Sequence, residues 1–281
     1  MGWGGGTLGD MLSAREVAEV EAAVRRVAAE QILPRFGRLA AADIAYKSSE
    51  TDLVTVADRA AEEELARHLT ALVPGSVMVG EEGVAADPGL LAAIGGDAPA
   101  WIVDPIDGTH NFVSGSPRFT TLVALAHRGR LLASWTFAPV MDLMAVAVAG
   151  GGAYVDGQRV RVRPVPPTLR HLDVTVSPPI WWRPEERAGY HRLSAHGVAL
   201  SFFDTSGLEY IQLASGRRTA MVIRWELPWD HAAGLLLHAE AGGVAMTADG
   251  GEVRIGGGNR LPFLVAPDAE TARLVLSALA D

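Results

Sequence analysis

The sequence predicts a layered α/β protein, and three observations lead to this prediction. Hydrophobic residues make up 49% of the 281 residues, which is ample material for a buried core. Strand-like patterns fill residues 119–162, and strands alternate with helices after residue 168. A meander followed by such alternation is typical of sheets covered by helices. We therefore expect one compact body of two closely packed halves.

Helical signals come first along the chain. Ser13 and Glu16 form the pattern of a capping box, and apolar residues then recur at helical spacing until Pro34. A second helix is expected over residues 56–72, where Pro74-Gly75 ends it. Short apolar runs at 77–79 and 101–103 predict two strands, the second of which is expected to end at Asp104.

The later elements follow turn signals. Arg128-Gly129-Arg130 and Asp156-Gly157 each predict a hairpin, and Pro164, Pro166 and Pro167 mark the best boundary between the halves. Beyond this boundary, strands are expected at 173–176, 200–203 and 219–223, and helices at 185–196, 207–215, 229–240 and from Asp268 to Ala280. The expected division is a flexible N-terminus over 1–12, an N-terminal half over 13–163 and a C-terminal half over 168–281.

Composition excludes several classes of function. The chain has no cysteine, so disulfides, thiolate zinc sites and a cysteine nucleophile are excluded. Its net charge of −9 disfavours binding to nucleic acid. The N-terminus lacks the pattern of a signal peptide, and the uncharged stretch 143–155 is shorter than the roughly 20 apolar residues of a membrane span. We expect a soluble cytoplasmic protein without membrane contact.

Carboxylates gather where predicted strands end or predicted helices begin. Asp104 and Asp107 lie in a tight turn after a strand, Glu81 follows another strand, and Asp58 and Asp230 lie near helix starts. Clustered carboxylates stay ionised only beside a compensating charge, which a hard divalent cation supplies. Mg²⁺ prefers oxygen ligands, and two such ions can clamp the oxygens of a phosphoryl transfer. The acidic residues therefore indicate a magnesium site.

Each of these features also has a purely structural explanation. The Asp104 to Gly108 turn is typical of many loops, Glu81-Glu82 of a solvated pair, and Asp58 and Asp230 of helix caps. Gly108-Thr109 is a candidate helix start whose free N–H groups would bind phosphate. Only the combination and order of these features indicate a catalytic site.

In this combination the chain resembles the inositol monophosphatase family of Mg²⁺-dependent, Li⁺-sensitive phosphatases. The matching segments are Lys47-Ser48-Ser49 with Asp52 to Asp58, Gly80-Glu81-Glu82, Trp101 to Phe112, and Pro228 to Gly243. Trp101 to Phe112 is the most specific of these and follows the family signature almost letter for letter. The resemblance covers roughly residues 15–280.

The resemblance implies a set of metal ligands. One Mg²⁺ would bind Glu81, Asp104 and the backbone carbonyl of Ile106. A second would bind Asp104, Asp107 and Asp230, and Glu81 would also reach a third, weaker ion. The implied cofactor is therefore two or three Mg²⁺ ions.

The resemblance also implies catalytic and substrate-binding roles. Thr109 and Asp58 would orient the attacking water, and Glu81 would be its acid–base partner. The N–H groups of Gly108 and Thr109 would meet the phosphate. The substrate contacts expected in total are Asp107, Gly108, Thr109, Ser206, Arg224 and Asp230.

The implied fold is a layered α/β/α/β/α sandwich, which in this family is usually a homodimer. The implied activity is hydrolysis of a small sugar or polyol phosphate, similar to inositol phosphate, by a metal-activated water. No covalent nucleophile is required, and no Gly-x-Ser-x-Gly motif is present.

The match weakens where substrate specificity is set. Ile223 stands where inositol phosphatases usually carry a glutamate that contacts a sugar hydroxyl, and residues 204–209 depart from the usual loop. We therefore expect a natural substrate other than myo-inositol phosphate. Arg224 is either a partner for an acidic group on the substrate or a surface arginine, and His110 is expected to be a partly exposed loop residue. For Trp181-Trp182 we expect buried packing rather than a dimer contact or a lid.

Several alternatives stay open at this point. Within the superfamily they are fructose-1,6-bisphosphatase, histidinol-phosphate phosphatase and 3′-phosphoadenosine-type nucleotidases. A non-catalytic metal-binding relative is disfavoured because Glu81, Asp104, Asp107, Thr109 and Asp230 are all present. A dinucleotide-binding protein is disfavoured because no Gly-x-Gly-x-x-Gly follows a strand.

Overall fold

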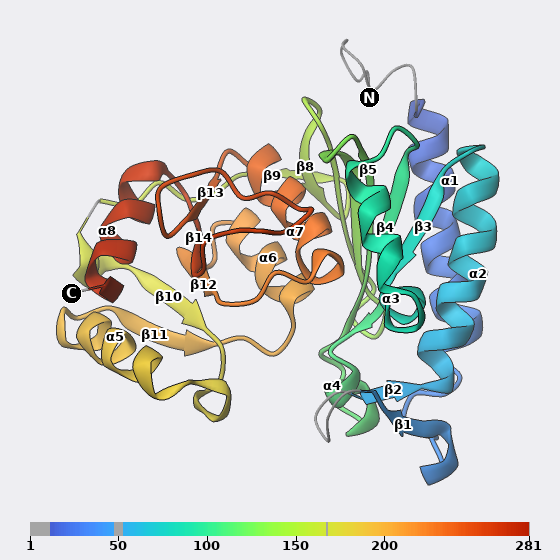
Figure 1. Ribbon diagram of the computed structural model, residues 1–281, viewed down its shortest axis with the longest axis horizontal. Coiled ribbons are helices and arrows are strands. Elements are labelled where there is room, and N and C mark those ends of the chain that lie inside the picture. The colour runs from blue at the N-terminus through green and yellow to red at the C-terminus, as the bar shows by residue number, and fades with distance from the viewer. Residues whose placement is uncertain (1–11, 48–52, 167, 281) are drawn as a thin grey trace.

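The computed structural model describes residues 12–47, 53–166 and 168–280. Helices and sheets alternate across the molecule in the order helices, sheet, helices, sheet, helices (Figure 1). This arrangement confirms the predicted α/β/α/β/α sandwich. Of residues 1–12, which were expected to be flexible, 1–11 lie outside the described residues, as do Ser48, Ser49 and Asp52 of the first motif, whereas Leu12 is buried in the core.

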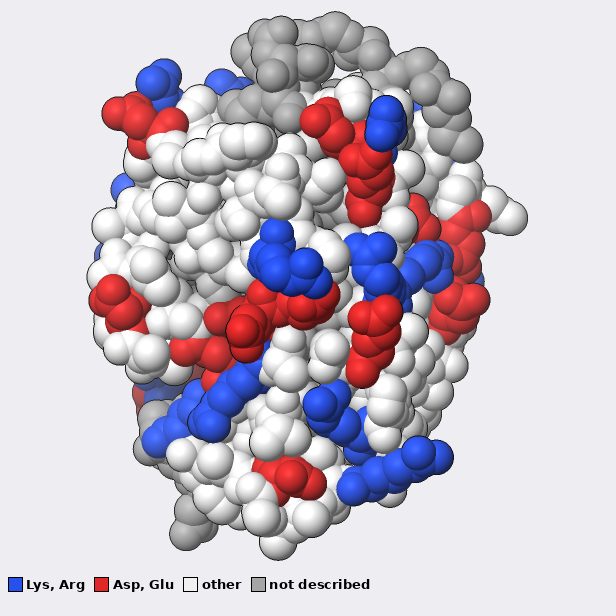
Figure 2. Space-filling view, turned by 90° about the vertical axis from the view of Figure 1, so that its right-hand side faces the viewer, with Lys and Arg blue, Asp and Glu red and all other residues white. Residues whose placement is uncertain are grey.

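The first layer consists of α1 (Ala14–Val27) and α2 (Val56–Leu72), which begin as the capping patterns predict. Ser13 accepts a hydrogen bond from the N–H of Glu16 and donates its own backbone N–H to that side chain at 2.6 Å. A short π-helical turn, Ala28–Ile32, continues α1. Figure 2 shows the outer face of this layer, where acidic and basic side chains lie interspersed.

A seven-stranded sheet forms the second layer, in the order β3-β4-β5-β6-β7-β8-β9. Only β3 and β4 are parallel, and the remaining neighbours are antiparallel. The strands are β3 (Val77–Gly80), β4 (Ala100–Asp107), β5 (Thr120–His127), β6 (Arg130–Ala138), β7 (Leu143–Val148), β8 (Gly152–Val155) and β9 (Gln158–Val160). The expectation that β4 ends at Asp104 is wrong, because the strand resumes its pairing at Asp107 after a shift of register.

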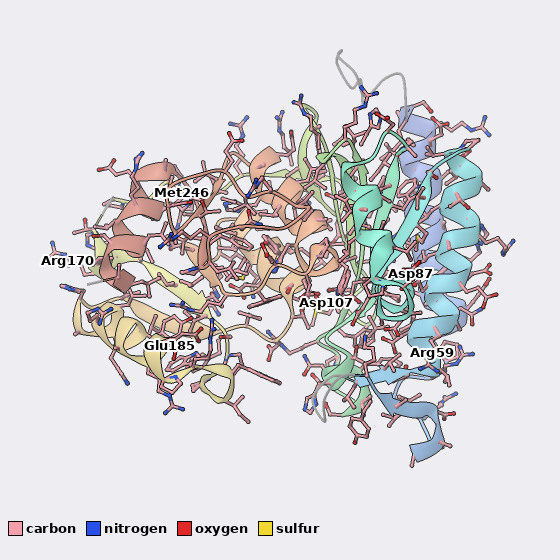
Figure 3. All side chains as sticks on the ribbon, in the orientation of Figure 1. Arg59, Asp87, Asp107, Arg170, Glu185 and Met246 are labelled. Atoms are coloured by element: carbon pink, nitrogen blue, oxygen red, sulfur yellow. The ribbon has the colours of Figure 1, made fainter. Side chains whose placement is uncertain are left out.

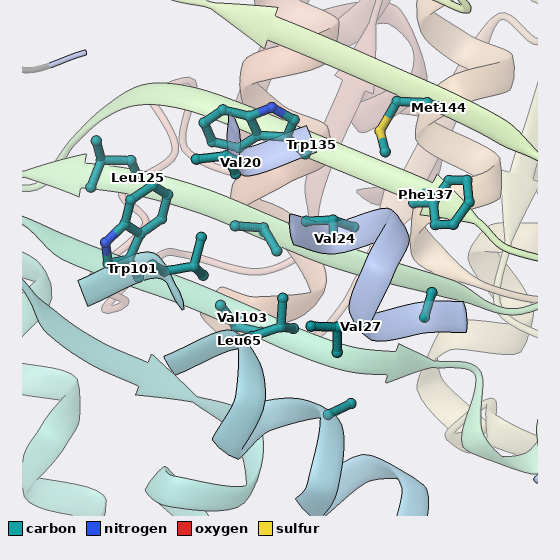
Figure 4. Close-up of a cluster of buried hydrophobic side chains, with 14 of the residues drawn as sticks. Val20, Val24, Val27, Leu65, Trp101, Val103, Leu125, Trp135, Phe137 and Met144 are labelled. Atoms are coloured by element: carbon teal, nitrogen blue, oxygen red, sulfur yellow. The ribbon is translucent and has the colours of Figure 1, made fainter. Parts of the chain in front are cut away.

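The core of this half lies between the sheet and the first helices. Figure 4 shows Val20, Val24 and Val27 of α1 among the large side chains of the sheet, which include Trp101 and Trp135. The Trp135 indole donates to the backbone carbonyl of Val17 at 3.2 Å, so this buried polar group is satisfied.

The second sheet has five strands in the order β11-β10-β12-β14-β13. Its strands are β10 (Asp173–Val176), β11 (Ala199–Phe202), β12 (Ala220–Ile223), β13 (Val244–Thr247) and β14 (Phe263–Ala266). The predictions for β10, β11 and β12 are confirmed to within one residue. The strands of the two sheets fall within residues 77–160 and 173–266 respectively.

Helices α6 (Ser206–Ala214) and α7 (Pro228–Glu240) lie between the sheets, and both are largely buried. Helices α5 (Pro184–Ala195) and α8 (Ala269–Ala280) cover the far face of the second sheet (Figure 1). Smaller elements border the site: the hairpin of β1 (Ile44–Tyr46) and β2 (Leu53–Thr55), and the short helices α3 (Glu81–Ala86) and α4 (Thr109–Val113). Across the described ranges, no helix is both long and apolar enough to cross a bilayer.

Candidate active site

A pocket of about 320 Å³ lies where the end of β4 meets the starts of α3, α4, α6 and α7. Figure 3 labels Asp107 at this junction, between the first sheet and the middle helices. The predicted site residues that line the pocket are Glu81, Asp104, Ile106, Asp107, Gly108, Thr109, Ser206 and Asp230. Segments far apart in the sequence thus meet in one place.

The turn after Asp104 is held by its own hydrogen bonds. The backbone N–H of Ile106 donates to Asp104 Oδ1 at 3.0 Å, and the Thr121 hydroxyl donates to the Pro105 carbonyl at 2.8 Å. The register shift in β4 lets Asp104 and Asp107 face the same pocket although they are three residues apart. Both carboxylates are buried.

Asp107 is held by groups from two other elements. The Thr120 hydroxyl of β5 and the N–H of Gly207 each donate to Asp107 Oδ2 at 2.7 Å. The N–H of Ser206 donates to Oδ1 at 3.3 Å. The first turn of α6 thereby fixes a carboxylate of the other sheet, which ties the two halves together at the site.

Glu81 begins α3 and lies beside a lysine. The Lys47 ammonium donates to Glu81 and, at 2.9 Å, to Glu82. Burial disfavours the charge on Lys47, but the two glutamates outweigh burial and raise the Lys47 pKa. Glu62 of α2 accepts the N–H groups of Glu82 and Gly83, at 2.9 and 2.7 Å, and so holds the start of α3.

Asp58 lies at the start of α2 and close to Thr109. It caps α2, because its Oδ2 accepts the N–H and hydroxyl of Thr55 at 2.8 and 2.5 Å. Its Oδ1 lies 3.4 Å from the Thr109 hydroxyl, which also donates to the Ile106 carbonyl at 3.0 Å. Burial raises the Asp58 pKa to about 7 despite the hydrogen bonds from Thr55.

Asp230 lies in the first turn of α7, and its Oδ2 accepts the indole N–H of Trp225 at 2.6 Å. Burial raises the pKa values of Asp104 and Asp230 well above the ordinary range, and neighbouring carboxylates, among them Glu81 and Asp107, add to this. The Asp107 pKa is raised to about 6, again chiefly by burial. Within the described residues, Asp104, Asp107 and Asp230 therefore have no ion-pair partner in contact, whereas Glu81 pairs with Lys47.

The donor set suits a hard divalent cation. It consists of carboxylate oxygens from three elements and the Ile106 carbonyl. A divalent cation would relieve the repulsion between the carboxylates. Within the described ranges, no three His, Asp or Glu side chains already stand at the mutual positions of a ligand shell, and Lys47 lies against Glu81 instead.

The structure does not bring every predicted substrate residue to the pocket. Arg224 lies outside the pocket lining, because its guanidinium donates to the Tyr190 hydroxyl at 2.9 Å and lies 3.6 Å from Glu186. Ile223 is buried in β12 within the core. His110 is exposed at the pocket, within α4 rather than in a loop.

The two adjacent tryptophans separate. Trp182 is half-buried and packs against Tyr190, with 4.6 Å between ring centroids, as the packing interpretation predicts. Trp181 is 55% exposed and lines the pocket, so buried packing is the wrong expectation for this residue. It is the last residue of a short 3₁₀ turn, Pro179–Trp181.

Two groups around the site were not predicted from the sequence: Thr120, which holds Asp107, and Trp225, which holds Asp230. A threonine at the start of a strand and a tryptophan three residues before Pro228 carry no local signal of such contacts. Their partners become visible only when the elements are assembled.

Comparison with known proteins agrees with this arrangement. The profile of the inositol monophosphatase family matches residues 13–278. An inositol monophosphatase of Dictyostelium discoideum is 33% identical over 225 residues, covering 74% of this chain and 76% of its own. An inositol-1-monophosphatase of Mesorhizobium japonicum is 31% identical over 240 residues, covering 81% of this chain and 83% of its own.

Solved structures share the fold. The IMPase of Thermotoga maritima superposes with a TM-score of 0.77 at 25% identity, covering 95% of this chain and 99% of its own. An inositol monophosphatase of Zymomonas mobilis gives the same TM-score at 24% identity. The order of motifs, the sandwich and the family profile lead to one conclusion: the chain belongs to the inositol monophosphatase family.

Proposed function

We propose that this phosphoric monoester hydrolase acts on small sugar or polyol phosphates in the presence of Mg²⁺. The observation that supports this most is the meeting of Glu81, Asp104, Asp107 and Asp230 in one pocket, where repulsion and burial raise carboxylate pKa values. The names of the relatives carry the same substrate class.

The chain offers ligands for two or three Mg²⁺ ions. Glu81, Asp104 and the Ile106 carbonyl would hold one ion, and Asp104, Asp107 and Asp230 a second, with Glu81 also available to a third. When bound, such ions lower the pKa of water and neutralise charge on the transferring phosphoryl group.

The residues of the chain supply orientation. The Thr109 hydroxyl and Asp58 form a pair that would position the attacking water, and Glu81 would take its proton. Gly108 adopts a φ of +90°, a conformation in which its N–H and that of Thr109 begin α4 and are available to phosphate oxygens. Phosphoryl transfer needs mainly such positioning and charge neutralisation.

The decisive experiment measures release of inorganic phosphate from inositol 1-phosphate with Mg²⁺, with EDTA and with added Li⁺. We expect activity with Mg²⁺ and its loss with EDTA. Asp104→Asn should lower kcat by roughly three orders of magnitude or more, because it removes a charge shared by two ions. Asp97→Asn is the control, since this exposed carboxylate pairs only with Arg128 at the surface in the described structure. Equal effects of the two substitutions would contradict the proposal.

A second candidate is hydrolysis of fructose 1,6-bisphosphate. A Thermotoga maritima relative named for both activities is 29% identical over 218 residues. Including this ester and histidinol phosphate in the same assay separates the candidates, and a protein inactive on every ester would be a non-catalytic relative. We further propose that the protein is a cytoplasmic homodimer that binds neither nucleic acid nor membrane. Light scattering of the purified protein tests its oligomeric state.

A further inference from the structure

The pocket has an aromatic part as well as an acidic part. Its large apolar lining residues include Trp229 of α7 and Trp181, Phe203, Trp225 and Leu227, and we refer to the last four as the aromatic wall. They come from the turn before α5, from the segment after β11 and from the segment after β12. All belong to the C-terminal portion of the chain, where the sequence departs from the family pattern.

The chain after β12 turns only one of its residues toward the pocket before Leu227. Ile223 is buried in the core, and Arg224 donates to the Tyr190 hydroxyl. Glu226 accepts the N–H groups of Asn259 and Gly258, at 2.9 and 3.3 Å. Arg224 and Glu226, the polar neighbours of Trp225, thus form hydrogen bonds away from the pocket, and Trp225 lines the pocket.

Trp225 is fixed on two sides. Its indole N–H donates to Asp230 Oδ2 at 2.6 Å, and 5.4 Å separates its ring centroid from that of Phe203. An aromatic pair at this separation is a favourable arrangement. The indole therefore joins the aromatic wall directly to the acidic residues.

The outer members of the wall are exposed to solvent. Trp181 is 55% exposed and Leu227 is 46% exposed, although both line a pocket. Removing such apolar surface from water is favourable, and a flat ring stacks well on an indole. The wall thus offers a surface that a ring in the pocket would cover.

Several polar groups of the same pocket are already hydrogen-bonded, whereas Ser206 and the exposed His110 also line it. The Asp204 carboxylate pairs with Arg118, and Thr205 Oγ1 accepts the N–H of Leu208 at 3.4 Å. Asp107 accepts hydrogen bonds on both oxygens. A hydroxyl that enters without a partner loses its hydrogen bonds to water, which lowers affinity for a ring bearing many hydroxyls.

We infer that the preferred substrate is a phosphate monoester whose alcohol carries a flat aromatic or heteroaromatic ring. The ring lies against the aromatic wall, and the phosphate lies at Asp104, Gly108 and Thr109. A pocket of about 320 Å³ suits a phosphate and one ring system. This inference rests on the proposed function for the phosphate end and adds the chemistry of the alcohol.

Kinetics with matched alkyl esters test the preference. With Mg²⁺, kcat/KM for 2-phenylethyl phosphate should exceed that for inositol 1-phosphate by about tenfold or more, and should also exceed that for 2-cyclohexylethyl phosphate. Trp181→Ala should reduce the ratio of kcat/KM between the phenyl ester and inositol 1-phosphate by about fivefold or more, mainly through KM. Ile180→Ala should leave this ratio unchanged, because Ile180 is 84% exposed and lies outside the pocket lining.

Binding without hydrolysis separates this inference from the proposed function. The probe is 3-phenylpropylphosphonate, which is compared with methylphosphonate in the presence of Mg²⁺ by quenching of tryptophan fluorescence. Tighter binding of the phenyl compound, weakened in Trp181→Ala and in Phe203→Leu, supports the aromatic wall even if no ester is hydrolysed, in which case only the proposed function fails. Equal binding of the two phosphonates, or a higher kcat/KM for inositol 1-phosphate than for the phenyl ester, would overturn the inference.

Discussion

Asp107 accepts hydrogen bonds on both of its carboxylate oxygens, and none of the three donors belongs to its own strand. As a metal ligand, the role that we propose for it, Asp107 would depend on these neighbours as much as on its own position, because partners of this kind fix the direction of the lone pairs. Thr120 is the only side chain among these donors. It is therefore a positioning residue whose contribution can be removed without changing a ligand.

Thr120→Val tests this positioning. Valine fills nearly the same volume in β5 but removes the 2.7 Å hydrogen bond to Asp107. We expect kcat/KM for inositol 1-phosphate to fall by about 10- to 100-fold and the Mg²⁺ concentration for half-maximal activity to rise. Thr136→Val is the control, since Thr136 of β6 is also buried but is not among the donors to Asp107. If both variants lose activity equally, the effect is one of packing and not of orientation.

At the same scale, the sequence predicts the acidic residues better than their surroundings. The sequence predicts that Glu81, Asp104, Asp107 and Asp230 share a site, and all four line one pocket. This prediction is possible because strand ends and helix starts are recognisable from local pattern. Arg224 is not brought there, since its direction depends on Tyr190 of a distant helix. Trp225 was missed for the same reason, as its hydrogen bond to Asp230 exists only in the assembled site.

At the scale of elements, α7 illustrates how one helix serves the site and the core. Its first turn presents Asp230, and near its end His238 donates Nε2–H to the Ala266 carbonyl of β14 at 2.8 Å. Within the described residues, His238 Nδ1 has no partner. Burial lowers the His238 pKa to about 4, although the hydrogen bond to Ala266 opposes this. The neutral imidazole therefore contributes to the packing of α7 against the second sheet.

This histidine predicts a pH dependence of stability. Because the pKa is about 4 in the folded protein and about 6.5 when unfolded, the unfolded state binds more protons between these values. The contribution of neutral His238 to the free energy of unfolding is complete above pH 6.5 and is lost as the pH falls toward 4. The loss amounts to about 3 kcal/mol at most. His238→Gln should remove this loss, so the difference in free energy of unfolding between wild type and variant should narrow on acidification. Urea titrations at several pH values measure it, and the exposed His196→Gln serves as control. Parallel curves for wild type and His238→Gln would contradict the prediction.

The elements themselves were predictable where patterns are long. Helix α2 has the predicted bounds, because a capping box begins it and Pro74-Gly75 follows it. Strands β13 and β14 were not predicted: each has four residues, and the glycine-rich segment between them carries no alternation. The predicted end of β4 is too early, because an aspartate after an apolar run is typical of a loop. In this protein, burial and the register shift keep Asp104 and Asp107 in the sheet.

For the whole molecule, the acidic pocket implies an opposition between stability and function. Carboxylates whose pKa values are raised by burial and by one another cost free energy in the folded protein. Cations that bind only the folded state offset this cost. Metal binding and folding should therefore be coupled.

Thermal unfolding with and without metal measures this coupling. We expect millimolar Mg²⁺ to raise the Tm of the wild-type protein and EDTA to reverse the shift. Asp104→Asn retains the shape of the side chain but removes its charge, so the metal-free variant should be more stable than the wild type by about 1–3 kcal/mol. The same variant should lose most of the Mg²⁺ effect, whereas Asp97→Asn should retain it. An equal Mg²⁺ shift in wild type and Asp104→Asn would show that the ion binds elsewhere.

The hydrogen bonds from the first turn of α6 to Asp107 have a consequence for biosynthesis. A ribosome releases the first sheet, with most of its acidic residues, well before the helices that lie between the two sheets. Until those helices emerge, the nascent chain has neither the amides that aim this aspartate nor the last acidic group of the pocket. Enzymatic competence therefore arises late and abruptly, when the C-terminal portion docks, and a truncated translation product would remain inert.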